Sequence, residues 1–136
     1  MSTSYKVTDL PVRGDDKGSL IAIEGAKDIP FSVARIFYIY GTQNNIIRGL
    51  HANRNSQFVL VCVHGSCDVK IKTPGQDDDA IIHLDAPHKT LWLDKMVWKE
   101  MYNFSKDAVL LVLSDHSYDP DEYIHSYDDL ARETAP

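Results

Sequence analysis

The stretch RGLHANRNSQFVLVCVHGSCDVKIK, residues 48–72, decides the fold. It opens with a compact polar cluster and passes into the apolar run 58–63. The chain then turns at His64-Gly65-Ser66 and leaves as the alternating segment 67–71. Two apolar segments joined by a short polar turn with a glycine predict an antiparallel β-hairpin at the centre of the protein.

The polar cluster directly precedes the first of these strands. Strand side chains alternate between the two faces of a sheet. If this alternation continues through residues 54 and 55, His51, Asn53 and Gln57 share a face with Val59 and Val61. Buried polar groups require partners, so three of them on an interior face indicate a site rather than a plain core.

Working outward, segments of strand length recur along the whole chain with short polar turns between them. They are residues 5–10, 18–24, 32–40, 80–84, 89–93, 96–104 and 108–114. Both faces of 32–40 are largely apolar, which predicts burial on both sides. Such a series of short strands is typical of an all-β sandwich or barrel, and 136 residues suit one domain, residues 1–136.

The C-terminal segment differs from the rest. Asp119, Pro120 and Glu122 have the spacing of a helix start, with a capping residue, a proline in the first turn and an acidic residue at the third position. Tyr123, Ile124, Tyr127 and Leu130 then recur at helical spacing. We expect one short C-terminal helix over the sheets.

Charge and composition exclude several classes of protein. The net charge of -6 argues against a nucleic-acid partner, because phosphate backbones require a basic surface. No apolar run has the length of a membrane span, and the N-terminus lacks a signal-peptide core. We expect a cytoplasmic protein with no membrane partner. Cys62 and Cys67 flank the hairpin turn, and we interpret both as buried thiols.

A β-helical barrel with a polar cluster opening a central strand resembles the cupins. In metal-binding cupins, histidines and a glutamate occupy four ligand positions. Those positions correspond here to His51, Asn53, Gln57 and Lys99. Amides and an ammonium group are poor ligands for a divalent metal, so we expect no metal and no cofactor.

Within the cupins, the chain most resembles the nucleotide-sugar 3,4-ketoisomerases, over nearly its whole length. The matching segments are GSLIAIE at 18–24, IPFS at 29–32, RGLHAN at 48–53, LVCVHGSC at 60–67, VWKEM at 97–101 and YDPDEYI at 118–124. The resemblance implies a cupin-type double-stranded β-helix, a jelly-roll barrel. It also implies a metal-independent isomerase that converts dTDP-4-keto-6-deoxy-D-glucose to a dTDP-3-keto-6-deoxyhexose, for 3-amino-3,6-dideoxy sugar biosynthesis.

The reaction needs a group that removes a proton from C3 of the sugar and another proton delivered to C4. A histidine suits this task, and the expected proton carrier is His51. Asn53 is expected to orient substrate or imidazole. Lys99 shares parity with Val97, and is expected either to shuttle a proton or to stabilise the enediolate as a cation. Tyr38 is a candidate donor to a carbonyl oxygen, with a core tyrosine as the alternative.

Four further residues are expected to bind substrate. Arg48 is the expected anchor of the diphosphate, because a guanidinium binds two phosphate oxygens at once. Arg35 is a second candidate, with a structural ion pair as the alternative. Gln57 and Asn103 complete the expected set.

The family resembled here forms homodimers in which N-terminal strands cross to the partner. Apolar side chains expected on outward faces, Trp98 with Tyr102 and Phe37 with Val33, also call for a cover. We therefore expect a homodimer with exchanged N-terminal strands.

Two other functions are compatible with the sequence. One is an epimerase acting on the same dTDP-keto sugar. The other is a non-catalytic cupin that binds nucleotide sugars, suggested by the amide and the lysine at family histidine positions.

Overall fold

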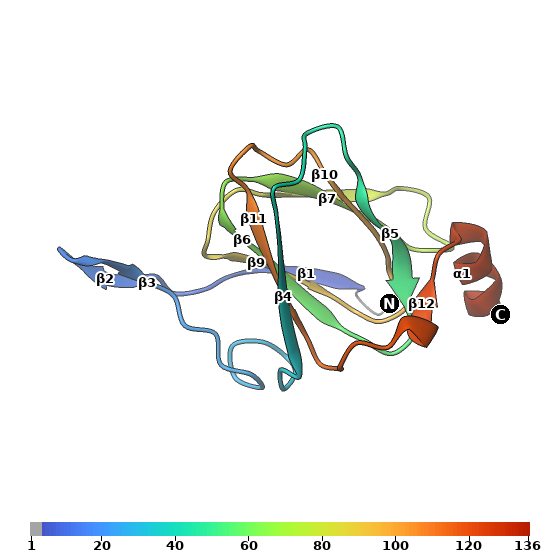
Figure 1. Ribbon diagram of the computed structural model, residues 1–136. Coiled ribbons are helices and arrows are strands. Elements are labelled where there is room, and N and C mark those ends of the chain that lie inside the picture. Colours follow the sequence, from blue (N-terminus) through green and yellow to red (C-terminus); the bar gives the residue numbers. More distant parts are fainter. Residues whose placement is uncertain (1–3) are drawn as a thin grey trace.

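The structure is a computed structural model in which residues 4–136 are described. Two five-stranded antiparallel sheets face each other and form a barrel (Figure 1). The first sheet has the order β1 (Tyr5–Asp9), β9 (Lys89–Leu93), β6 (Phe58–His64), β11 (Val109–Ser114), β4 (Arg35–Tyr40). The second has the order β12 (Tyr123–Ile124), β5 (Arg48–Asn53), β10 (Trp98–Tyr102), β7 (Cys67–Lys72), β8 (Ala80–Leu84). The predicted all-β barrel is confirmed.

The space between the sheets is filled by their inward-facing apolar side chains. Leu60, Leu91, Leu110, Val69 and Ile71 are all buried there. Cys62 and Cys67 are free thiols in the same core, as predicted. The barrel interior therefore holds one continuous apolar core.

One prediction about the central stretch was wrong. Residues 48–63 do not form a continuous strand, because β5 and β6 belong to opposite sheets and residues 54–57 turn the corner between them. The alternation restarts at this corner. Phe58 and Leu60 consequently face the barrel interior, whereas Val59 and Val61 pack on the outside beneath the loop that carries Ile29.

The outward faces also differ from expectation. Trp98 is buried under the C-terminal helix, where its ring meets that of Tyr127 edge to face. Phe37 faces the interior, so the exposed residues of β4 are those of opposite parity, Ile36, Tyr38 and Tyr40. The expectation that β4 is covered on both sides is not met within one chain.

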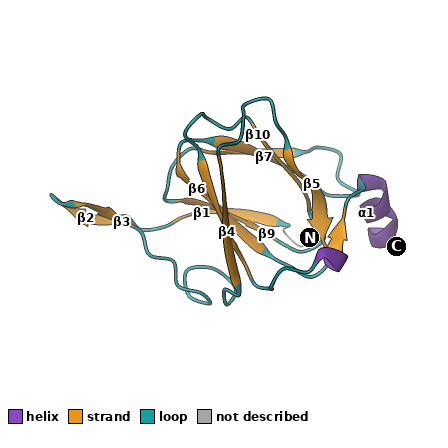
Figure 2. Cartoon of the chain, in the orientation of Figure 1, coloured by secondary structure: helices purple, strands orange, loops and turns teal. Residues whose placement is uncertain are grey.

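The C-terminal helix begins later than predicted. Asp119 caps a short 3-10 helix, η1 (Pro120–Glu122), after which β12 joins the second sheet. Helix α1 (Tyr127–Thr134) then begins with Ser126 as its cap (Figure 2). The tail therefore first adds an edge strand beside β5, because Tyr123 and Ile124 pair with Asn53 and Ala52.

The N-terminal hairpin stands apart from the barrel. Strands β2 (Arg13–Asp15) and β3 (Gly18–Leu20) pair only with each other, and Figure 1 shows them projecting away from both sheets. All six of their residues are exposed. Within residues 4–136, no helix has the combination of length and apolar character that crossing a membrane requires.

Candidate active site

His51 is aimed into the barrel by an irregular stretch of β5. Gly49 and Leu50 both have positive φ angles, and the pairing of β5 with β10 shifts register beside Lys99. A side chain at Gly49 would meet the carbonyl oxygen of Lys99 at 2.9 Å, so glycine is needed there. This bulge brings the carbonyl of Gly49 within 2.9 Å of His51 Nδ1.

That contact determines how the imidazole is used. A carbonyl only accepts, so Nδ1 carries the proton and Nε2 keeps a free lone pair. Burial, together with the nearby charge of Lys99, lowers the pKa of His51 to about 4. At neutral pH the imidazole is therefore uncharged and able to accept a proton.

Lys99 is buried opposite His51, on β10, as its parity predicted. Its ammonium nitrogen donates to Asn53 Oδ1 at 3.1 Å and lies 4.6 Å from the ring centre of Phe58. Burial lowers the pKa of Lys99 to about 7, although the charge of Glu122 opposes the change. A group with this pKa can hold or release a proton near neutrality.

A cavity of about 190 Å³ joins these groups. Its walls come from β4, β5, β6, β10, β11 and β12, and it is lined by Phe37, Ile39, Arg48, Gly49, His51, Phe58, Leu60, Lys99, Met101, Val112 and Tyr123. This is below the usual range for a drug-sized ligand. A single sugar ring suits such a space, and larger groups attached to the ring would have to lie outside it.

A wider, shallower depression of about 620 Å³ lies beside Gly41, Ser66 and Asn103. It contains neither His51 nor Lys99, so the smaller cavity is the better candidate for proton chemistry. Asn103, predicted to bind substrate, is placed at this wider depression, where its amide donates to Asp68 at 3.0 Å.

Arg35 carries an unusual pair of buried groups. Its Nε and Nη2 atoms have no hydrogen-bond partner among residues 4–136, and its guanidinium carbon lies 5.1 Å from the ring centre of Phe37 and 5.6 Å from that of Tyr118. The pairing of β4, β11 and β6 places Arg35 level with Phe58, which lines the cavity. Buried cationic donors without an acceptor are costly, so this side chain is suited to an anion.

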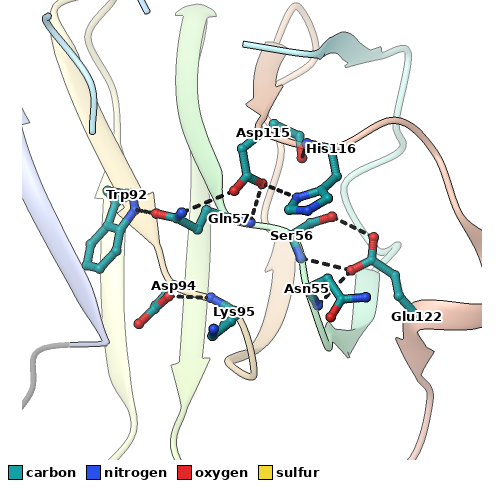
Figure 3. Close-up of polar contacts among 10 residues, drawn as sticks. Asn55, Ser56, Gln57, Trp92, Asp94, Lys95, Asp115, His116 and Glu122 are labelled. Carbon is teal, nitrogen blue, oxygen red and sulfur yellow. Dashed lines mark hydrogen bonds and ion pairs between the residues drawn. The ribbon is translucent and has the colours of Figure 1, made fainter. Parts of the chain in front are cut away.

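The other predicted site residues are dispersed. Arg48 and His51 line the cavity, and Asn53 reaches it through Lys99. Gln57 does not, because the corner after β5 turns it toward Trp92 and Asp115, which bind its amide at 2.9 and 3.1 Å (Figure 3). Tyr38 is 61% exposed on the outer face of β4, so its catalytic role stays a prediction.

Two residues at this site were not singled out from the sequence. Tyr123 lines the cavity, and its ring centre lies 4.7 Å from that of His51. Glu122 is buried behind the corner at residues 54–57. Both belong to the tail that was predicted to be helical, and an edge strand there would have placed Tyr123 beside β5.

The donor set does not favour a metal. Among residues 4–136, no cluster of three or more His, Cys, Asp or Glu side chains is positioned to hold one. His51 and Asn53 are the cupin ligand positions that reach the cavity, together with the ammonium of Lys99. One imidazole beside a cation and an amide is a poor divalent site.

The sequence matches a known family over almost its whole length. The family model described as FdtA, WxcM-like, C-terminal, matches residues 3–135. The chain belongs to this family. A FdtA-family relative from Aneurinibacillus thermoaerophilus, named TDP-4-oxo-6-deoxy-alpha-D-glucose-3,4-oxoisomerase, is 43% identical over 121 residues, which cover 87% of this chain and 84% of the relative.

Solved structures of similar proteins confirm the cupin-like fold of this FdtA-family chain. A 3,4-ketoisomerase from Helicobacter canadensis is 39% identical with a TM-score of 0.92, and 97% of this chain and 98% of that one are covered. A variant of the 3,4-ketoisomerase QdtA from Thermoanaerobacterium thermosaccharolyticum, in complex with TDP-4-keto-6-deoxyglucose, is 35% identical with a TM-score of 0.92. The match covers 98% of this chain and 95% of that one.

Proposed function

We propose that this protein is a metal-independent sugar 3,4-ketoisomerase that converts dTDP-4-keto-6-deoxy-D-glucose to a dTDP-3-keto-6-deoxyhexose. Membership of a family whose relatives are named 3,4-ketoisomerases supports the reaction class. The observation that carries the proposal is the neutral His51, with Nε2 free, beside its buried cross-strand partner Lys99 in a cavity that suits one sugar ring.

These two groups suffice for the proton movements. His51 Nε2 accepts the C3 proton, the C3–H electron pair forms a C3–C4 double bond, and the C4 carbonyl oxygen becomes an enolate oxygen. Protonated Lys99 stabilises that oxygen and gives it a proton. Neutral Lys99 then takes the proton of the C3 hydroxyl as the C3 carbonyl forms, and His51 returns its proton to C4. No oxidant is consumed, because the substrate and product are isomers.

The remaining substrate groups require positions outside the cavity. The cations available to a diphosphate on the strands around the cavity are Arg35 on β4 and Arg48 on β5. Arg48 lines the cavity itself, whereas Arg35 offers two buried donors that lack acceptors. We assign the diphosphate to these arginines, with Arg35 as the stronger candidate.

Arg35→Met is expected to weaken TDP binding about 10- to 100-fold, because one charge-assisted hydrogen bond contributes about 1.5–3 kcal/mol. Titration calorimetry with TDP measures the loss, with Arg48→Met in parallel and Arg132→Gln, an exposed arginine on α1, as the control. Unchanged TDP affinity in Arg35→Met would limit Arg35 to a structural role.

We also propose that the protein is a homodimer in which the N-terminal strands contact the partner. The support is the projecting β2–β3 hairpin, together with β4, an edge strand whose Ile36, Tyr38 and Tyr40 are all more than half exposed. Edge strands with an apolar outer face pair readily with another chain.

Tyr40→Glu is expected to shift the protein from dimer to monomer, because it buries a charge in the proposed interface. Light scattering after size-exclusion chromatography measures the mass at several concentrations. Ile81→Glu is a matched control, since Ile81 is also exposed but lies on β8, at the far edge of the second sheet. A wild-type protein that is monomeric throughout would overturn the proposal.

Proton NMR tests the function directly. The protein is incubated with dTDP-4-keto-6-deoxyglucose in deuterated buffer without added metal. The expected result is loss of the C3 proton signal and appearance of a 3-keto product. Exchange at C3 or C5 without a 3-keto product would point to an epimerase, and bound but unchanged sugar would point to a non-catalytic binding protein.

A further inference from the structure

The carboxylate of Glu122 accepts three hydrogen bonds close to the site. Its Oε2 accepts from the Ser56 hydroxyl at 2.5 Å, and its Oε1 accepts from the backbone N–H groups of Ser56 and Asn55 at 2.9 and 3.0 Å (Figure 3). Its own backbone carbonyl accepts from Arg54 N at 3.0 Å. One residue of η1 therefore binds three consecutive N–H groups of the corner between β5 and β6.

The carboxylate is also ionised in this buried position. Burial opposes its ionisation, but the hydrogen bonds from Ser56 and from the corner backbone outweigh it, so that the pKa of Glu122 is lowered. Glu122 thus carries a fixed negative charge although only 3% of the residue's surface is exposed. Fixed buried charges of this kind require a reason, because unpaired ones are destabilising.

The charge of Glu122 acts on Lys99, whose pKa it raises. Asn53 precedes the corner and lies between them, accepting from Lys99 through Oδ1, while its Nδ2 is buried without a well-formed hydrogen bond. The charged or titratable groups that act on Lys99 are His51 from β5 and Glu122 from η1, and Phe58 from β6 contributes its ring.

We propose that Glu122 is a positioning residue: by holding the corner after β5 it keeps Asn53 aligned on Lys99, and its negative charge keeps Lys99 protonated in the cavity. The inference rests on the proposed function, because it concerns the form of Lys99 that meets the enediolate. The tail segment 119–124 therefore tunes the site electrostatically as well as covering it.

Removing the charge gives a prediction with a definite sign. The negative charge of Glu122 raises the pKa of Lys99 against the lowering by burial, so Glu122→Gln lowers that pKa below its wild-type value of about 7. The alkaline limb of the kcat/KM profile then moves to lower pH. At pH 8 the rate relative to wild type is expected to fall about three- to tenfold more than at pH 6, with little change in KM.

Two matched variants separate the effect of the Glu122 charge on Lys99 from the effect of the hydrogen bonds by which Glu122 holds the corner. Ser56→Ala removes one hydrogen bond but keeps the carboxylate, so it lowers the melting temperature and leaves the alkaline limb in place. Glu133→Gln removes an exposed carboxylate that pairs with Arg54 and leaves the limb in place as well. A limb that does not move in Glu122→Gln, or that moves equally in Ser56→Ala, overturns the proposal.

A second readout does not depend on turnover. NMR titration of the Lys99 side chain in wild type and Glu122→Gln reports the same shift even if the protein does not isomerise the sugar. Should Glu122→Gln be too unstable for an NMR titration, chemical denaturation of Glu122→Gln and of Glu122→Gln/Lys99→Met tests the inference instead. At acidic pH, where Lys99 binds a proton even without Glu122, the double variant is expected to be more stable than Glu122→Gln alone, because the unpaired buried cation is gone. Equal or lower stability overturns the inference.

Discussion

His51→Gln is expected to lower kcat/KM about 1000-fold, within the range typical for loss of a general base. Glutamine keeps an amide near the position of the imidazole but cannot accept a proton at neutral pH. His51 Nδ1 donates to the Gly49 carbonyl, so Nε2 is the nitrogen left to accept the substrate proton in the cavity. The substitution therefore removes the function of Nε2. Steady-state kinetics and solvent-deuterium incorporation at C3 should decline together.

His64→Gln is the matched control, because His64 is an exposed histidine at the end of β6 that pairs with Asp107. It should keep wild-type kinetics. His51→Gln with full turnover would remove His51 from the mechanism, and deuterium exchange without product would show that His51 acts only in the second proton transfer.

Lys99→Met is expected to lower kcat about 100-fold with a smaller change in KM, because it removes the cation that faces the developing oxyanion. It should also change the pH dependence of stability. The pKa of Lys99 is lowered from 10.5 to about 7 by burial, so between these values the unfolded chain binds the proton and the folded chain does not. The contribution of Lys99 to the free energy of unfolding therefore becomes more favourable as pH rises from 7 toward 10.5, so the fold becomes more stable over this range.

Chemical denaturation at several pH values measures this effect. The difference in unfolding free energy between wild type and Lys99→Met should rise by about 1.4 kcal/mol per pH unit near the middle of that window, the limit for one proton. Lys95→Met, in the exposed turn before β10, should show no such slope. A flat difference for Lys99→Met would mean that Lys99 stays protonated in the fold at high pH.

The sequence by itself determined the fold class, because turn residues and alternating apolar residues recur at strand spacing throughout the chain. It also identified the ketoisomerase family, from segments such as 18–24 and 60–67, and the inward parity of Lys99 on β10. These features are local, so neighbouring residues are enough to specify them.

Only the tertiary structure decided which polar residues meet. The corner at residues 54–57 places β5 and β6 in opposite sheets, and this reverses the face on which Gln57 was expected. The tail sequence fits a helix locally, yet β12 forms because β5 offers an unpaired edge there. Glu122 and Tyr123 thereby reach the site. Strand pairing between distant segments depends on hydrogen bonds and packing that no local pattern contains, and it is this pairing that assembles His51, Asn53 and Lys99.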